Sequence, residues 1–144
     1  MKINVSSSDL REQLDKAFGA IVSNPVVHIL EDFLFTVKDN TLTITATDLE
    51  TSIITELEVQ AEEEGTMAIP AKILIDTLKA LPEQPISLEL DEDNQSIELT
   101  SQYGKYHLAA HDPEDYPEIP EDEDADSFEM KGPELEQALQ HTLF

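Results

Sequence analysis

Two stretches of the chain place apolar residues at the spacing of an amphipathic helix. The first begins at Ser8, the expected N-cap, and its apolar face is formed by Leu10, Leu14, Ala17, Phe18 and Ile21. The second follows Pro70, a residue favoured at helix starts, and its apolar face is formed by Leu74, Leu78 and Leu81. The pattern therefore predicts helices over residues 8–22 and 70–81.

Elsewhere apolar and polar residues alternate, which is typical of half-buried strands. The clearest case is TLTITAT at residues 41–47, and Asp39 and Asn40 form a turn signal just before it. Strands are expected at residues 3–5, 33–37, 41–47, 51–59, 66–69, 85–90, 96–101 and 105–111. About eight strands in antiparallel sheets and two helices predict an α+β fold.

The end of the chain has a different character. Three prolines punctuate the acidic stretch DPEDYPEIPEDEDAD, which keeps it out of helices and central strands. After it, Phe128 and Met130 have strand spacing, and Leu135, Leu139 and Leu143 have helix spacing, so residues 128–144 repeat the pattern of the first strand and helix 125 positions later. We therefore expect a first domain at 1–120, an acidic linker at 121–127 and the start of a second, truncated domain at 128–144.

Charge narrows the possible functions. The 144 residues include 32 acidic and 8 basic ones, giving a formal net charge of −24. Such a chain repels polyanions, which taken alone argues against nucleic acid. Three interpretations compete: a solvated surface adapted to high salt, an acidic protein that mimics DNA, and calcium chelation.

The calcium interpretation can be tested on the sequence. Asp122, Asp124 and Asp126 stand at alternate positions, as in an EF-hand loop. That loop next requires a glycine and, at its twelfth position, a bidentate glutamate, but Ser127 and Pro133 occupy those places. An acidic linker is the better interpretation.

No feature points to catalysis or to a bound group. The chain has no cysteine, the histidines (His28, His107, His111 and His141) lack zinc-like spacing, and the four glycines form no phosphate loop. We expect no catalytic residues, no metal and no cofactor. There is also no apolar run of membrane-spanning length and no signal-peptide pattern at the start, so we expect a cytoplasmic protein without a membrane partner.

Several ordered motifs resemble one family. The segments MKINVSSSDL, NPVVHIL, LTITATDLE, AIPAKILIDTLKALP and GKYHLAAHDPEDYPEIPE are similar to the amino-terminal domain of the β sliding clamp, the processivity subunit of bacterial DNA polymerase III. The resemblance implies a clamp module with two helices packed on antiparallel sheets. It also implies three such modules per chain and a homodimeric ring that encircles double-stranded DNA and tethers the replicative polymerase without catalysing a reaction. This chain would then be a fragment that is unable to close the ring alone.

The resemblance also assigns DNA-binding residues, because the helices of each module line the hole of the ring. Lys72 corresponds to a basic position that touches DNA, and Asn24 to a position where many relatives have arginine. Arg11, Lys16 and Lys79 lie in the same two predicted helices. From the sequence alone, without the resemblance, these basic residues are better interpreted as ordinary solvated side chains. Asparagine can donate a hydrogen bond to phosphate but carries no charge, so contact at Asn24 should be weaker.

A subunit interface is implied as well. Lys105, Tyr106 and Leu108 in the last strand correspond to positions that pack against the partner subunit, although the strand can also face its own core. The groove for polymerase and clamp-loader peptides lies between the second and third domains, which this chain lacks. Two alternatives stay open: a DNA mimic and an unrelated salt-adapted domain. A map of surface charge distinguishes them, because a clamp concentrates its few lysines on the helices.

Overall fold

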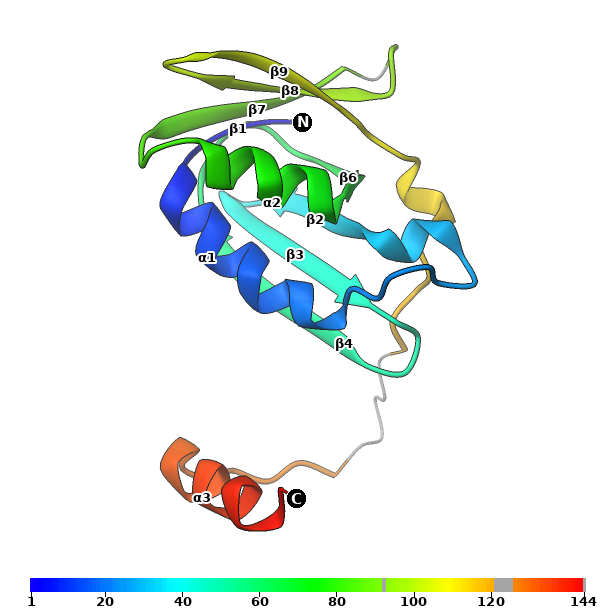
Figure 1. The fold of residues 1–144 in the computed structure, drawn as a ribbon, viewed down its shortest axis with the longest axis vertical. Helices are drawn as coiled ribbons and strands as arrows, with labels where there is room; N and C mark the ends of the chain where they lie inside the picture. Colours follow the sequence, from blue (N-terminus) through cyan, green and yellow to red (C-terminus); the bar gives the residue numbers. More distant parts are fainter. Residues whose placement is uncertain (92, 121–125, 144) are drawn as a thin grey trace.

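Two antiparallel sheets and a pair of helices form the main body of the protein (Figure 1). The computed structural model describes residues 1–91, 93–120 and 126–143. Of the sheets, one has the strand order β4-β3-β2-β6 and the other the order β5-β1-β7-β8-β9. The helices α1 and α2 lie next to each other and cover the space between the sheets (Figure 1). The predicted α+β fold, with two helices packed on antiparallel sheets, is confirmed.

The first helix, α1, spans Ser7–Ala17 and is shorter than predicted. Its buried face is formed by Leu10, Leu14 and Ala17, but the following residues Phe18–Ala20 form the 3₁₀ turn η1, and Ile21 is already extended. Glycine at position 19 and Pro25 shortly beyond do not favour further helix. The N-cap is Ser6 rather than Ser8, and the two hydroxyl oxygens lie 2.8 Å apart.

The second helix, α2, spans Ala71–Ala80, within one residue of the prediction at each end. Leu74, Ile75 and Leu78 are buried, while Lys72, Asp76 and Lys79 are exposed. Pro70 precedes the helix as its N-cap residue, and Leu81 ends it in an extended conformation. The helix therefore has one face for the core and one face for solvent.

The four-stranded sheet contains the predicted meander. Its strands are β2 (Asp32–Lys38), β3 (Thr41–Thr47), β4 (Ser52–Glu58) and β6 (Gly65–Pro70). The register pairs Phe35 with Ile44 and with Met67, so these buried side chains share the core face of the sheet. Asp39 and Asn40 both have positive φ angles, 50° and 60°, and make the predicted turn between β2 and β3.

The five-stranded sheet contains one strand, β5, that the sequence pattern does not predict. It consists of β1 (Lys2–Ser6), β5 (Gln60–Glu63), β7 (Pro85–Asp91), β8 (Ser96–Ser101) and β9 (Gly104–Ala109). The described residues thus form nine strands rather than eight. In β5 the sequence QAEE has no apolar alternation, and it becomes a strand because it pairs with β1 after the chain crosses between sheets at the buried Val59.

The core lies between the two sheets and beneath the helices. It includes Phe33 and Phe35 from β2, Leu10 and Leu14 from α1, and Leu88 from β7, none of which is accessible to solvent. Burying an aliphatic or aromatic side chain of this size contributes roughly 1.5–3 kcal/mol. The pairing of the sheets and the helices therefore depends on one shared cluster.

The segment after β9 returns to the four-stranded sheet. His111 forms a bridge with Ala68 of β6, and the short 3₁₀ turn η3 (Pro113–Asp115) follows. Tyr116 is buried, and its hydroxyl donates a hydrogen bond to the Thr45 carbonyl oxygen at 3.3 Å. Burial raises the pKa of the Tyr116 hydroxyl to about 12. The aromatic ring fastens this segment onto the sheet.

Beyond it lies the helix α3 (Gly132–Thr142), which is set apart from the main body in Figure 1. Every residue from 126 to 143 is exposed. The strand predicted at Phe128 and Met130 is wrong, because these residues belong to no strand, and a strand requires a neighbour with which to pair. Most of the predicted linker, including Asp122 and Asp124, lies outside the described residues. No helix in the described part of the chain is long and apolar enough to span a membrane.

Candidate nucleic-acid interface

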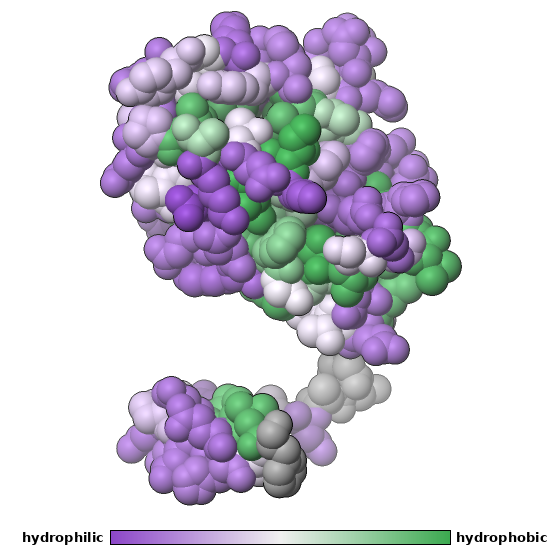
Figure 2. All heavy atoms as spheres, in the orientation of Figure 1, coloured by the Kyte–Doolittle hydropathy of each residue, from purple (hydrophilic) through white to green (hydrophobic). Residues whose placement is uncertain are grey.

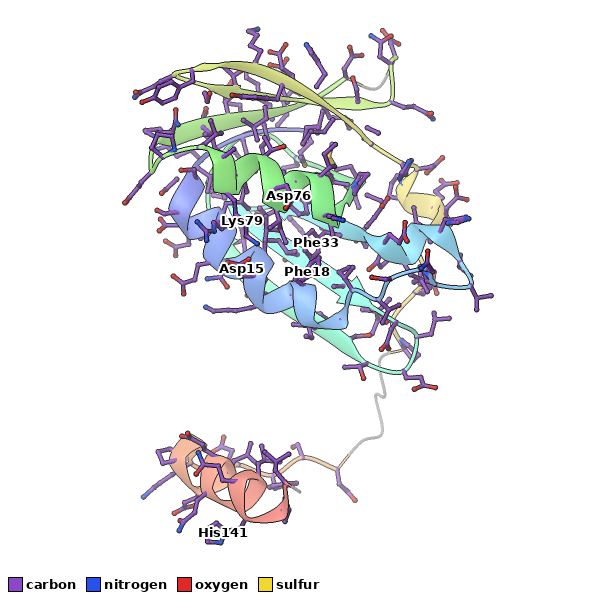
Figure 3. The ribbon with its side chains drawn as sticks, in the orientation of Figure 1. Asp15, Phe18, Phe33, Asp76, Lys79 and His141 are labelled. Atoms are coloured by element: carbon purple, nitrogen blue, oxygen red, sulfur yellow. The ribbon has the colours of Figure 1, made fainter. Side chains whose placement is uncertain are left out.

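The solvent-facing side of α1 and α2 holds four of the predicted DNA-binding residues. Arg11 and Lys16 are exposed on α1, and Lys72 and Lys79 are exposed on α2. The two helices contact each other, so the structure brings the four residues to one layer of the molecule. In Figure 3, Lys79 and Asp15 both lie in the strip where the helices face each other.

The basic residues of α1 are paired within their own helix. Arg11 Nε lies 3.6 Å from Asp15 Oδ2, and Lys16 Nζ lies 2.9 Å from Glu12 Oε1. Both pairs join residues four apart and are exposed, so each contributes only about 0.3–0.5 kcal/mol to stability. Phosphate would have to compete with a carboxylate for these cations.

The lysines of α2 differ in this respect. Neither Lys72 nor Lys79 forms an ion pair with any residue that the structure describes. Lys72 stands in the first turn of α2, where the backbone N–H groups of the helix are directed outward. A phosphate could meet both a free ammonium group and this positive end of the helix dipole.

Taken together, the two helices carry no net charge. The sequences of α1 and α2 contain four basic and four acidic residues, whereas the rest of the chain contains four basic and 28 acidic ones. The strong negative charge therefore lies in the remainder of the chain, whereas positive and negative residues are equal in number in the helix pair.

Asn24 lies in the turn that follows η1 and is exposed. Its φ angle is 57°, a left-handed conformation that asparagine tolerates better than most residues. The backbone N–H of Asn24 donates a hydrogen bond to Glu31 Oε1 at 3.3 Å. The side-chain amide of Asn24 forms no hydrogen bond with any residue that the structure describes. The amide is thus available to donate to an acceptor outside the domain.

Asn24 and Lys72 line a common cleft with a volume of about 750 Å³. The cleft lies where the end of α1, the start of α2 and the segments around His28 and Asp112 converge. At its inner wall, His111 Nδ1 and Asp32 Oδ2 are 2.5 Å apart. Asp32 is 2% exposed, and burial raises the pKa of its carboxyl group although the hydrogen bond from His111 opposes this shift.

The predicted subunit-interface residues lie on β9, an edge strand of the five-stranded sheet. Leu108 is 5% exposed and belongs to the core of its own domain, and Tyr106 packs partly against the same cluster. Lys105 is exposed and its Nζ lies 2.7 Å from Glu98 Oε1. This strand can therefore offer a partner its edge backbone and Lys105, whereas Leu108 faces inward.

Sequence reasoning did not find the acidic wall of the cleft. Glu31, Asp32, Asp112 and Asp115 come from two segments about 80 positions apart, and the structure brings them to one site. In a chain with 32 acidic residues, no spacing marks these four. Within residues 1–91, 93–120 and 126–143, no group of three or more His, Asp or Glu side chains could hold a metal ion.

Comparison with known proteins places the chain in a family. Residues 1–120 match the family model for the DNA polymerase III beta subunit, N-terminal domain. The chain is 26% identical to a beta sliding clamp from Vibrio harveyi, covering all of this chain and 99% of that protein. It is 27% identical to a beta sliding clamp from Haemophilus influenzae, of which it spans only 39%.

Solved structures share the fold. The DNA polymerase III subunit beta from Pseudomonas aeruginosa superposes with a TM-score of 0.90 at 22% identity, over 97% of this chain and 38% of that one. The Helicobacter pylori beta clamp bound to a DNA ligase peptide superposes with a TM-score of 0.79 at 23% identity, over 85% of this chain and 34% of that one. With the two-sheet body, the paired helices and the match over residues 1–120, the chain belongs to the DNA polymerase III beta subunit family, by its N-terminal domain.

Proposed function

We propose that this chain is the first module of a DNA sliding clamp subunit. In the complete protein, three modules per subunit and two subunits would close around double-stranded DNA and tether the replicative polymerase. The role is non-catalytic, because the clamp holds the polymerase near its template and makes or breaks no bond itself. Polymerase and clamp-loader peptides would bind to domains outside this chain.

One observation carries the proposal: in a chain of net charge −24, the helix pair is neutral and its α2 lysines have no ion-pair partner in the described structure. A surface that slides along DNA needs weak attraction rather than strong binding. Lys72 and Lys79 supply free charge for phosphates, and Arg11 and Lys16 supply charge that Asp15 and Glu12 moderate. Asn24 adds an uncharged donor beside Lys72 in the cleft.

The acidity of the remaining surface is compatible with this role. Binding that relies on phosphate contacts weakens steeply as salt rises, but a closed ring retains DNA by topology. At 1 M salt the Debye length falls to about 3 Å, so repulsion between DNA and the distant acidic sheets is largely screened. We infer that the protein works at high salt concentration.

The division of the chain follows from the same proposal. Residues 1–120 form the first module, 121–127 the linker, and 128–144 the beginning of the second. The likeness to the Pseudomonas aeruginosa protein covers 97% of this chain, which supports assigning α3 to the beginning of the next module. The exposed leucines of α3, Leu135 and Leu139, would be buried once that module is complete.

Subunit contact is proposed for the edge of β9. Among the residues that the structure describes, no strand neighbours its backbone on the side away from β8, and such an edge can pair with a strand of another chain. Lys105 and the partly buried Tyr106 lie along it and would contribute polar and aromatic contacts. Leu108 would act indirectly, by holding the strand against its own core.

A DNA mimic remains the second candidate function because of the charge. A mimic should present carboxylates in a track with the spacing of phosphates, and it gains nothing from a neutral helix layer. The neutrality of α1 and α2 therefore favours the clamp.

The test uses the full-length protein loaded on nicked circular DNA. We expect Lys72→Ala combined with Lys79→Ala to weaken binding to linear duplex DNA several-fold and to lower the salt slope by roughly 1–2, because each lost phosphate contact removes about 0.9 from the slope. Retention on the circle should persist and should end when the DNA is linearised. Filter binding at several salt concentrations and gel filtration measure the two properties.

Lys38→Ala combined with Lys131→Ala is the matched control, because both are exposed lysines outside the helix layer, at the end of β2 and before α3. If it weakens binding as much as the helix variant, the lysines act only through net charge. If the wild-type protein leaves circular and linear DNA at the same rate, the clamp proposal fails.

A further inference from the structure

The cleft between the end of α1 and the start of α2 has an apolar floor. Its lining includes Phe18, Ile21, Val22, Ile29 and Pro70. Phe18 and Val22 are about 40% exposed, and Val26 and Val27 beyond them are more exposed still. Figure 2 shows apolar atoms gathered around this end of α1, whereas the surface over β8 and β9 at the top of the view is mostly hydrophilic. Such exposed apolar groups next to a concave surface are typical of a docking site.

The charge of the same cleft is negative. Its described lining holds four carboxylates, Glu31, Asp32, Asp112 and Asp115, against one lysine, Lys72. The two histidines that line it, His28 and His111, do not balance them, and His111 is already engaged by Asp32. A phosphate that entered beyond Lys72 would meet carboxylates, whereas a cation would be attracted.

One of the carboxylates in the cleft, that of Asp32, is buried rather than exposed. Its side chain is 97% buried, yet only Oδ2 is hydrogen-bonded within the described structure, to His111 Nδ1. Asp32 also lines the cleft, so a cation there would approach a carboxylate that is largely shielded from water. A charge-assisted hydrogen bond to such a carboxylate is stronger than one to an exposed carboxylate.

We propose that this cleft is a docking site for a partner protein's peptide in which arginine alternates with apolar side chains. The apolar residues would cover Phe18, Val22 and Ile29, and a guanidinium group would reach Asp32 between Glu31 and Asp115. Arginine suits the site better than lysine because its planar donors can serve two carboxylates at once. A volume of about 750 Å³ is typical of a site for a short peptide segment or a similar ligand.

This inference goes beyond the clamp role and does not depend on it. DNA approaching the helix layer would touch Lys72 and Asn24 at the rim, while the peptide would occupy the carboxylate side of the cleft. The two ligands would therefore compete at the rim. Duplex DNA is the alternative occupant, and the experiment distinguishes it.

The test is an NMR titration of the isotope-labelled 144-residue chain at 0.15 M NaCl. The probe is the peptide acetyl-Leu-Arg-Leu-Arg-amide, with acetyl-Leu-Glu-Leu-Glu-amide and a 12-base-pair duplex as comparison ligands. We expect the arginine peptide to shift the amide signals of Val22, Ile29, Glu31 and Asp115. The double variant Glu31→Gln with Asp115→Asn should bind it about fivefold more weakly, as expected for the loss of two partly exposed charge pairs.

The matched control removes the same charge elsewhere. Glu56→Gln with Glu58→Gln neutralises two exposed carboxylates on β4, outside the cleft, and should leave the peptide affinity within twofold. Peptide shifts scattered over the acidic surface, or an equal loss in both double variants, would overturn the proposal. A second result would also overturn it: the duplex, and not the peptide, shifts the amide signals of the cleft, and Glu31→Gln with Asp115→Asn binds the duplex more tightly. The cleft would then be a DNA-binding site.

Discussion

Asp32 is a carboxylate whose environment opposes its charge. Burial raises its pKa above the ordinary 3.8, and the hydrogen bond from His111 only partly offsets this. A raised pKa means that the folded state binds the proton more tightly than the unfolded state does. The contribution to stability is therefore present below the ordinary pKa and is lost as the pH rises through the raised value. Most acid-sensitive carboxylates behave in the opposite way.

We accordingly expect Asp32→Asn, which keeps an acceptor for His111, to gain stability relative to wild type as the pH rises from about 3.5 to 7. Asp48→Asn should show the opposite trend. The backbone N–H groups of Thr51 and Glu50 lower the pKa of Asp48, so its contribution is present above the unfolded pKa and lost in acid. Urea unfolding followed by circular dichroism at several pH values measures both. A pH-independent difference for Asp32→Asn would contradict the assignment.

Asn24 combines a backbone requirement with a binding role. In Asn24→Arg the new side chain restores a charge beside Lys72, so the affinity for duplex DNA should rise several-fold and the salt slope should steepen by about 0.9. The left-handed backbone at φ 57° should cost about 1 kcal/mol with arginine. Asn24→Gly separates the two effects, because it keeps the backbone conformation and removes the amide. Unchanged DNA binding by Asn24→Arg would exclude this turn from the interface.

Among the elements, those with strong internal periodicity were predictable. The stripe of Leu74 and Leu78 located α2 to within one residue at each end, because the same residues that define the pattern are the ones buried. The end of α1 was not predictable in this way. Phe18 continues the apolar spacing, but it is 40% exposed and belongs to η1, so it lines the cleft instead of the core.

Elements that depend on distant partners were not predictable from local pattern. β5 is a strand only because it can pair with the edge of β1. Residues 128–130 are not a strand, because no strand in the described part of the chain pairs with them.

The cleft likewise depends on segments that are distant in the sequence. Glu31 and Asp115 come to line one cleft because the segment after β9 forms a bridge with Ala68 of β6. The family resemblance pointed to Asn24 and Lys72, but no local signal predicted the carboxylates that line the same cleft.

The proposed boundary between modules makes α1 and α3 respond differently to the same change. Leu14 on α1 is fully buried, so Leu14→Ala should lower the free energy of unfolding by about 2–5 kcal/mol. Leu139 on α3 is 53% exposed, so Leu139→Ala in the 144-residue chain should stay within about 0.5 kcal/mol. Urea unfolding monitored by circular dichroism compares them. A loss of more than 1 kcal/mol for Leu139→Ala would mean that α3 packs on the first module in solution.

Two opposing contributions determine the stability of the whole chain: its hydrophobic core favours folding, and its large excess of negative charge opposes it. The core joins both sheets and both helices, and the described basic residues other than Lys38, Lys72, Lys79 and Lys131 are paired with carboxylates. Most of the 32 acidic residues therefore have no cationic partner and repel one another. This repulsion opposes the compact state, and its range is set by the salt concentration.

Raising NaCl from 0.1 M to 1 M shortens the Debye length from about 10 Å to about 3 Å, which removes repulsion between carboxylates on different strands. We expect the gain in stability to be at least about 1 kcal/mol, equivalent to a rise in Tm of about 4 °C or more for a domain of this size. Thermal unfolding followed by circular dichroism gives the value. Because Glu56→Gln with Glu58→Gln removes part of the repulsion beforehand, this variant should start from a higher Tm at 0.1 M and gain less from salt. A Tm that does not change between the two salt concentrations would show that the acidic surface is not an adaptation to salt. The net charge would then need a different explanation, and the DNA-mimic function would be the first to reconsider.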